Sequence, residues 1–274
     1  LFLGIAISSI GQLGGGKSTL NAWLDVATIQ SLNHKGVVSD IVANYGHIVI
    51  DECHHVASVR LEEVLKRSKA KFILGLTATP QRRDGHHPII FMQCGPIRYR
   101  MSEKKSAAQR KFEHKFFERK TGFTLEDEKE LKLTQVYEAL TMSVDRNELI
   151  IKEVSKALDL GRSPLVLTER KDHLQYFTKR VEMFCENVIC LHGGYSTKKL
   201  QQELKRLKEI PANQPRIVLA IGSFIGEGFD DCRFDTLFLT YPLSWKGRLQ
   251  QYAGRLHRDN FNKSEVQIYD YVDE

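Results

Sequence analysis

Cysteine is scarce in this sequence, and its distribution argues against two classes of protein. No Cys-x-x-Cys pair is present to suggest a zinc site. An odd number of scattered cysteines fits reduced thiols better than a disulfide framework. We therefore expect a cytoplasmic protein. The five residues are Cys53, Cys94, Cys185, Cys190 and Cys232.

Long apolar runs are absent as well. No stretch approaches the roughly 20 consecutive apolar residues that a membrane-spanning helix needs, so we expect no membrane partner. The composition of 42% hydrophobic and 27% charged residues is ordinary for a folded protein. The length of 274 residues suggests two domains at roughly 150 residues per domain.

The charge balance is basic. Lys and Arg number 40 against 34 Asp and Glu, which gives a formal net charge of +6. The isoelectric point is near 9.0. Such a balance is compatible with a nucleic-acid partner but does not establish one. The composition leaves the oligomeric state open.

Short apolar runs alternate with amphipathic stretches, which is typical of a βαβ protein with parallel sheets. The first series predicts strands at Ile5–Ile10, Val26–Gln30, His47–Asp51 and Phe72–Leu76, with helices at Val38–Tyr45 and Val59–Arg67. The second series predicts strands at Leu165–Thr168, Val188–Leu191, Ile217–Ile221, Thr236–Thr240 and Val266–Tyr269. Helices at Lys171–Phe184, Thr197–Lys208 and Trp245–Leu256 separate the strands of this second series. We expect two α/β lobes, residues 1–103 and 146–274, joined by a charged connector over residues 104–145.

The strongest local signal is the segment His47–His54, where an apolar run leads into the adjacent carboxylates of Asp51 and Glu52. Ligands in open α/β sheets bind at the carboxyl ends of strands. A carboxylate there can hold the water shell of Mg²⁺, and its neighbour can orient an attacking water. The alternative is an acidic surface turn without function.

A second apolar run ends in the hydroxyl residues of Thr77-Ala-Thr79-Pro80. On its own this pattern fits any strand terminus that a proline stops. If the two runs are neighbouring parallel strands, their ends place acidic and hydroxyl side chains around one pocket.

At this point the sequence resembles a known family. The segments Asp51–His54, Thr77–Pro80, Ile221–Asp230 and Gln251–Arg258 look like motifs II, III, V and VI of the superfamily-two helicases, and they occur in the expected order. The context of Gly75–Tyr99 looks like the bacterial branch of type III restriction subunits and XPB-like DNA helicases. The resemblance covers nearly the whole chain and implies two RecA-like lobes that use ATP and Mg²⁺.

The resemblance also implies roles for individual residues. Asp51 would coordinate Mg²⁺ through water, and Glu52 would be the general base for the water that attacks the γ-phosphate. Residues that couple the nucleotide to the nucleic-acid groove would be His54, Thr77 and Thr79. Residues of the ATP-binding site would include Gly228, Asp230 and Gln251. Arginine fingers from the second lobe would be Arg255 and Arg258.

Physical reasoning agrees with the arginine assignment. A phosphoryl-transfer transition state spreads negative charge over its equatorial oxygens, and an inserted guanidinium contributes a factor of about 10³–10⁵ in rate. If the acids lie on one lobe and the arginines on the other, hydrolysis depends on lobe closure. The alternative for Arg255 and Arg258, spaced i and i+3, is a solvated helix face.

Residues Gly11–Ser18 satisfy the phosphate-loop pattern GxxxxGK[ST], in which Lys17 would contact phosphates. The context is poor, because a phosphate loop should open a substantial helix and only Thr19–Asp25 precedes the next strand. In the family branch a similar run lies downstream of the true motif I. We therefore interpret Gly11–Ser18 as a glycine-rich strand and turn. The expectation that follows is a first lobe lacking its phosphate loop, in a fragment that does not hydrolyse ATP alone.

For the nucleic acid, the resemblance implies backbone contacts from both lobes, with DNA favoured by the branch. The candidates are Thr28, Gln30, Thr168, Arg170, His192, Gly193 and Gly194. The two glycines would let backbone N–H groups approach a phosphate closely. Their alternative is a tight turn with no ligand. Two rival functions stay open at this stage, a small P-loop ATPase or kinase that uses Lys17 and a non-catalytic nucleic-acid-binding module.

Overall fold

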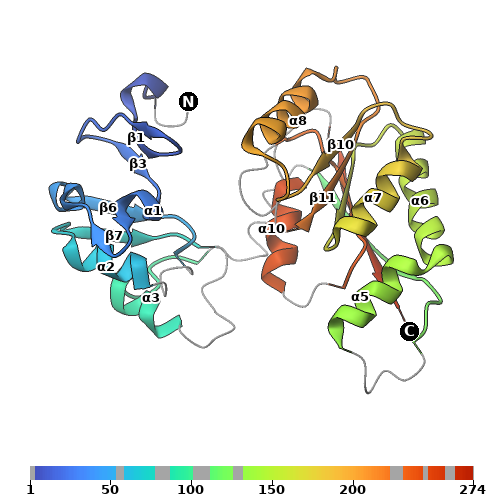
Figure 1. Cartoon of the computed structure of the whole chain (residues 1–274), viewed down its shortest axis with the longest axis horizontal. Helices are drawn as coiled ribbons and strands as arrows, with labels where there is room; N and C mark the ends of the chain where they lie inside the picture. The colour runs from blue at the N-terminus through green and yellow to red at the C-terminus, as the bar shows by residue number, and fades with distance from the viewer. Residues whose placement is uncertain are drawn as a thin grey trace. The chain divides into compact units, whose positions relative to one another are not determined.

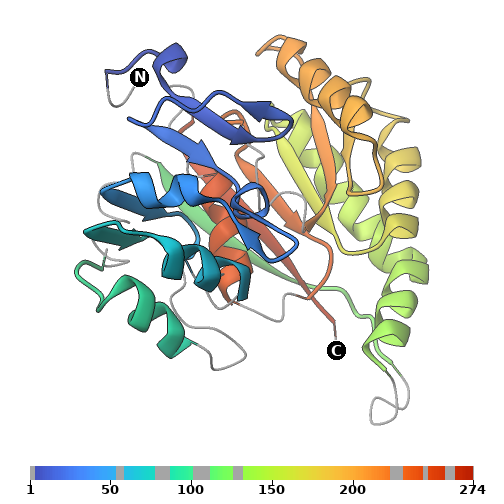
Figure 2. The same ribbon diagram turned by 60° about the vertical axis from the view of Figure 1, so that its left-hand side comes forward.

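The computed structural model describes residues 4–53, 59–77, 87–100, 112–125, 132–222, 231–242, 246–256 and 263–273. The chain divides into two compact units, Leu1–Met101 and Ser102–Glu274 (Figures 1 and 2). Both units mix helices with strands, as the sequence predicts for an α/β protein.

The first unit consists of short elements. Its strands are β1 (Gly11–Gly14), β2 (Lys17–Ser18), β3 (Asp25–Ala27), β4 (Asn33–His34), β5 (Val37–Val38), β6 (His47–Ile50) and β7 (Phe72–Gly75). They form three small sheets, ordered β2-β1-β3, β4-β5 and β6-β7. Its helices are the 3₁₀ helices η1 (Ile7–Ser9) and η2 (Asp40–Asn44) and the α-helices α1 (Ile29–Leu32), α2 (Val59–Arg67) and α3 (His87–Cys94).

The core of the first unit lies on one face of the β6-β7 sheet. Helix α2 buries Leu61 and Val64 there, against Ile50 at the end of β6. The opposite face carries Val49 and Phe72, whose exposures are 55% and 59%. Strands β6 and β7 are parallel and pair Ile50 with Gly75, so their carboxyl ends meet at one edge.

Three predictions for the first unit were wrong in detail. The expected strand Ile5–Ile10 is occupied by η1, where Ser9 N donates to Ala6 O and Ile10 N to Ile7 O. The expected strand Val26–Gln30 ends at Ala27, because Thr28 caps helix α1. The expected helix Val38–Tyr45 is reduced to the 3₁₀ helix η2.

The second unit is built around a six-stranded parallel sheet in the order β10-β11-β9-β12-β13-β8. Its strands are β8 (Glu113–Lys120), β9 (Pro164–Thr168), β10 (Val188–Leu191), β11 (Ile217–Ile221), β12 (Thr236–Leu239) and β13 (Glu265–Val272). Its helices are α5 (Leu133–Met142), α6 (Val144–Asp159), α7 (Lys171–Val181), α8 (Thr197–Glu209) and α10 (Lys246–Leu256).

Helices cover both faces of this sheet, since alternate strand residues enter two different cores. Leu165 and Leu167 of β9 pack with residues of α8 and α10. Val166 packs on the other side, with residues of α6 and α7. Figure 1 shows the two helix pairs on opposite sides of the strands.

Much of the predicted connector 104–145 belongs to the second unit instead. Strand β8 pairs along its whole length with β13, and Phe117 stacks on Tyr269 with ring centroids 4.8 Å apart. Helix α5 contacts the end of β12 through Tyr137 and Tyr241. Strand β8 reads Glu-His-Lys-Phe-Phe-Glu-Arg-Lys, and such charged sequences are tolerated at sheet edges. This charge is why the sequence pattern concealed the strand.

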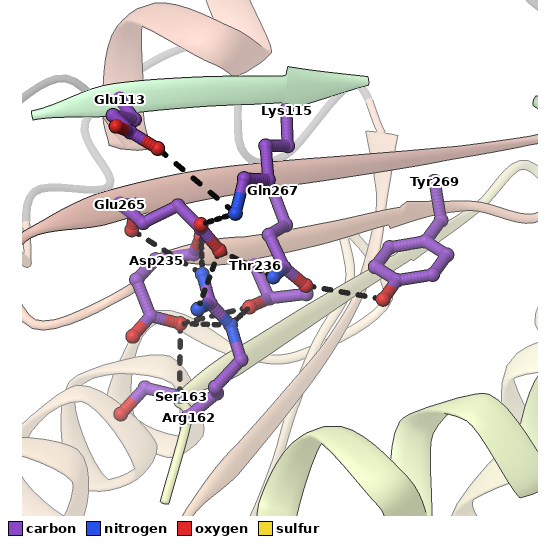
Figure 3. Close-up of polar contacts among 9 residues, drawn as sticks. All are labelled: Glu113, Lys115, Arg162, Ser163, Asp235, Thr236, Glu265, Gln267 and Tyr269. Carbon is purple, nitrogen blue, oxygen red and sulfur yellow. Dashed lines mark hydrogen bonds and ion pairs between the residues drawn. The ribbon is translucent and has the colours of Figure 1, made fainter. Parts of the chain in front are cut away.

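A polar network closes the amino-terminal edge of the same sheet (Figure 3). Arg162, which precedes β9, donates to Thr236 Oγ1 at 2.5 Å and to Glu265 Oε1 at 3.2 Å. It also reaches the backbone carbonyls of Asp235 and Glu265. Lys115 of β8 forms an ion pair with Glu265. The network therefore joins β8, β9, β12 and β13 at the end opposite to the candidate site.

Candidate functional site

The acidic pair lies where the sequence predicts it, directly after β6. Asp51 is exposed, and its Oδ1 accepts a hydrogen bond from Glu52 N at 3.0 Å. Glu52 has a φ of +48°, in the left-handed region that non-glycine residues rarely adopt. Such conformations cluster at functional sites, where the surroundings enforce them.

Backbone hydrogen bonds fix this turn to the neighbouring strand. Leu76 N donates to Ile50 O, and Cys53 N donates to Leu76 O, both at 2.8 Å. The acids therefore leave the sheet beside Thr77, the half-buried residue that follows β7. Thr79 and His54 lie outside the described residues.

The arrangement suits a hydrated Mg²⁺. This ion prefers oxygen ligands in octahedral geometry, keeps several waters, and is held in proteins by one or two carboxylates together with substrate phosphates. Asp51 offers an exposed carboxylate of that kind. Within the described part of the chain, no cluster of three or more His, Cys, Asp or Glu side chains forms a closed metal cage.

The segment Gly11–Ser18 is a β-hairpin, which confirms the interpretation as strand and turn. Strands β1 and β2 are antiparallel, with Leu13 opposite Ser18 and Gly14 opposite Lys17. The two connecting residues, Gly15 and Gly16, have φ of +61° and +79°, as a type I′ turn requires. A phosphate loop joins a strand to a helix, whereas Lys17 lies in a strand. This geometry removes the structural basis for a P-loop enzyme that uses Lys17.

Thr28 and Gln30 are both exposed and flank the start of helix α1. Thr28 Oγ1 accepts from Ser31 N at 3.3 Å and contacts Ser31 Oγ at 2.8 Å. The hydroxyl therefore already serves as an N-cap. A role in contacting nucleic acid stays a prediction for both residues.

In the second unit, the candidate residues gather at the carboxyl ends of β9 and β10. Thr168 is only 2% exposed, so its side chain is an internal support rather than a surface contact. Its Oγ1 pairs with His173 Nδ1 at 3.2 Å, and His173 Nε2 pairs with Asn147 Oδ1 at 2.8 Å. Burial lowers the pKa of His173 to about 3, so the imidazole is neutral. A buried hydrogen-bond chain thus holds the turn that carries Arg170.

Arg170 is partly exposed and paired within its own turn. Its Nη2 lies 2.5 Å from Asp172 Oδ2, and its Nε lies 3.0 Å from Asp172 Oδ1. The hydrogen bonds from Arg170 lower the pKa of Asp172. A phosphate that contacts Arg170 would therefore compete with this carboxylate.

Beside this turn, His192, Gly193 and Gly194 follow β10. Gly194 N donates to His192 Nδ1 at 3.0 Å, so in the neutral ring Nε2 carries the proton and can donate. A Cβ on Gly194 would lie 2.7 Å from Lys171 Nζ, so the ammonium group of this flexible side chain lies beside the glycine. Burial, and then the Lys171 charge, lowers the pKa of His192. Lys171 is a member of this edge that the sequence analysis missed.

The helix of the predicted arginine fingers is firmly anchored. Tyr252 and Leu256 of α10 are buried in the sheet core, and Arg255 between them is half-buried. A Cβ on Gly222, just after β11, would lie 2.5 Å from Tyr252 Oη and 2.9 Å from Glu169 Oε1. The ends of β9 and β11 therefore meet α10, a contact that no motif had indicated. Gly228, Asp230, Arg258 and the side chain of Gln251 lie outside the described residues.

None of the helices in the described residues is both long and apolar enough to cross a membrane.

Comparison with known proteins finds helicases among the relatives of this chain. Residues 8–82 match the family model described as type III restriction enzyme, res subunit. The chain is 25% identical to a putative ATP-dependent RNA helicase of Acanthamoeba polyphaga mimivirus, over 90% of this chain and 47% of the relative. It is 29% identical to the DNA 3'-5' translocase XPB2 of Sulfurisphaera tokodaii, over 43% of this chain and 26% of that protein.

The fold comparison agrees. The structure of Dbp5 from S. cerevisiae bound to RNA and ADP BeF3 aligns with 97% of this chain and 64% of that chain, at 11% identity and a TM-score of 0.64. The chain spans about half the length of the curated viral relatives that it matches. The family match over residues 8–82 and the helicase relatives show that the chain is similar to helicases of superfamily two.

Proposed function

We propose that this chain is part of an ATP-dependent helicase or translocase that moves along nucleic acid, with DNA preferred over RNA. The observation that carries the proposal is the Asp51-Glu52 pair at the carboxyl end of a parallel strand, in a turn whose backbone is left-handed at Glu52. The preference for DNA rests on the branch of the family, and the charge of the chain supports a nucleic-acid partner in general.

In this proposal Asp51 holds a hydrated Mg²⁺, which supplies charge neutralisation to the phosphates of ATP. Glu52, which lies in the turn that backbone hydrogen bonds fix to the neighbouring strand, orients the attacking water and accepts its proton. Arg255 and Arg258 neutralise charge that develops on the transferred phosphoryl group. ATP-binding contacts are assigned to Gly228, Asp230 and Gln251, and the coupling of nucleotide to nucleic acid is assigned to His54, Thr77 and Thr79.

The nucleic-acid contacts are proposed for the strand ends of the second unit, with Thr28 and Gln30 contributing from the first. His192 and the backbone N–H groups of Gly193 and Gly194 donate to phosphates, and Lys171 adds a charge beside them. Thr168 acts indirectly, because its buried hydroxyl supports the turn of Arg170. Such contacts carry no base information, so binding should tolerate any sequence and weaken with salt.

A matched pair of lysine variants tests the nucleic-acid proposal. Lys171→Ala and Lys208→Ala each remove one exposed charge, but Lys208 lies in the last turn of α8, far along the helix from its start near Gly194. Fluorescence anisotropy with labelled single strands measures affinity as salt increases. We expect Lys171→Ala to reduce the slope of log affinity against log salt by about 0.7, as the loss of one phosphate contact should. A flat salt response in the unmodified protein, or equal effects of the two variants, contradicts the proposed surface.

A separate measurement tests the catalytic proposal. In protein that hydrolyses ATP, Glu52→Gln should abolish phosphate release while nucleic-acid binding persists, because the amide cannot accept a proton from water. Unchanged hydrolysis by Glu52→Gln would favour a different base. We also propose a cytoplasmic location, since all five cysteines are thiols in the structure.

A further inference from the structure

Two cysteine thiols meet behind the acidic pair. Cys53 follows Glu52 directly and is only 3% exposed. Cys94 is the last residue of helix α3, which packs against β7, and it is half-buried. The two residues come from distant parts of the first unit, and neither has a role in the proposed ATP hydrolysis.

Gly75, at the end of β7, makes room for both sulfur atoms. A Cβ at this position would lie 2.8 Å from Cys53 Sγ and 3.0 Å from Cys94 Sγ. Both sulfurs therefore border the same small space, and no side chain of Gly75 separates them. The two thiols are also hydrogen-bonded to each other. In the described residues the other cysteines have different surroundings: Cys190 contacts Thr178 Oγ1 at 3.0 Å, Cys185 is buried, and Cys232 is exposed.

We propose that Cys53 and Cys94 are a site of reversible oxidation and form a disulfide by exchange with a low-molecular-weight disulfide such as glutathione disulfide. This inference goes beyond the proposed helicase function and does not depend on it. The pairing is favoured over other pairs because these two sulfurs already border one small space, and a disulfide bond requires its two sulfur atoms to come together.

The exchange proceeds in two steps. Cys94, the more exposed of the two, loses its proton and its thiolate attacks one sulfur of the small disulfide, which releases one small thiol. Cys53 then loses its proton and attacks the Cys94 sulfur, which expels the second small thiol. The protein loses two protons and two electrons, and the small disulfide takes them up to become two thiols.

The surroundings of the two thiols make the rate of this exchange slow at neutral pH. Burial raises the pKa of Cys53 to about 11, and the neighbouring Cys94 and Glu52 add to the rise. Burial also raises the pKa of Cys94. Because the Cys94 thiolate makes the first attack, the rate of the exchange should increase with pH.

Oxidation would connect two elements of the first unit covalently. The backbone of Cys53 is already bound to Leu76, and its neighbours are Asp51 and Glu52. The disulfide would attach this turn to the carboxyl end of α3, so the bond would restrain the segment that holds the acidic pair.

Peptide mapping of the whole 274-residue chain tests the pairing. The folded protein is incubated with glutathione disulfide at mildly alkaline pH, remaining thiols are alkylated, and the digest is analysed by mass spectrometry. We expect the Cys53–Cys94 peptide as the main cross-link. Cys185→Ser, which removes a buried cysteine elsewhere, should leave the yield unchanged, whereas Cys94→Ser should leave Cys53 reduced.

Two further results bear on the proposal. Gly75→Ala should slow cross-linking, because the new methyl group occupies the space between the sulfurs. If that variant does not fold, the map of the unmodified protein still decides the matter. Glutathione adducts on Cys94 and Cys232 without a cross-link, or cross-links among other cysteines at equal yield in the folded protein, would overturn the assignment.

Discussion

Replacing Arg162 with methionine tests how the sheet of the second unit is held at its amino-terminal edge. The Arg162 side chain is 13% exposed and lies 3.6 Å from Asp235 Oδ1. Removing one partner of a buried ion pair costs about 3–5 kcal/mol. Asp235 keeps hydrogen bonds from Ser163 N at 3.1 Å and Thr236 Oγ1 at 2.9 Å, so we take the lower end of that range. We expect Arg162→Met to lower the free energy of unfolding by about 3 kcal/mol, more than a hundredfold in the unfolding equilibrium.

The loss of stability in Arg162→Met should depend on pH. Burial raises the pKa of Asp235, and Arg162 opposes that rise. Without the guanidinium the carboxylate is costlier to keep charged, so its folded-state pKa rises further. A raised folded-state pKa means that protonation favours the folded state, and the deficit of the variant should therefore shrink as the pH falls and Asp235 becomes protonated.

The assay is hydrogen exchange of the β9 and β12 amides, together with urea unfolding followed by far-UV circular dichroism. Lys115→Met is the matched control. Lys115 forms an ion pair with the same Glu265, but its side chain is 48% exposed, so its removal should cost at most about 1 kcal/mol. Equal losses for Arg162→Met and Lys115→Met would refute the reasoning from burial.

Two other predictions follow from single sites. His173 should stay neutral in the folded protein down to a pH of about 3, whereas its unfolded pKa is 6.5. A lowered folded-state pKa means that the unfolded state binds the proton first, so stability should fall by about 1.4 kcal/mol per pH unit below about pH 6. NMR titration of the ring and a comparison with His173→Gln check this, and a ring that titrates near pH 6 in the folded state would contradict it. In the β1-β2 hairpin, Gly15→Asn should be tolerated, since asparagine accepts positive φ, whereas Gly15→Val should cost about 1–2 kcal/mol. Hydrogen exchange of the β1 amides measures both variants, and equal protection in the two would count against the turn assignment.

Elements with concentrated apolar runs were predictable from the sequence. The bounds of α2, β10 and β11 agree with the prediction, because each is an apolar or amphipathic pattern with polar residues on both sides. Strand β8 was missed, because its charges face solvent at a sheet edge and its partner β13 lies far along the chain. The two short 3₁₀ helices were predicted as a strand and as an α-helix. Each is so short that its sequence pattern does not distinguish the three kinds of structure.

The sequence predicted which residue types form the candidate site better than it predicted their burial and backbone conformation. The position of Asp51 after a strand follows from the apolar run before it, but the left-handed backbone of Glu52 depends on hydrogen bonds to the neighbouring strand. Thr168 has the residue type of a phosphate contact, yet packing buries it against His173. Lys171 was missed for the opposite reason, because only the fold brings it beside Gly194.

The most direct test of the central claim is ATP hydrolysis by the purified chain, with and without single-stranded DNA. The central claim is that the strand-end acids Asp51 and Glu52 serve the phosphates and that Lys17 does not, because Lys17 lies in a β-hairpin. We predict that this chain alone releases no phosphate above background and that Lys17→Ala changes neither this rate nor the affinity for ATP. Phosphate release that is stimulated by nucleic acid and lost in Lys17→Ala would contradict the account.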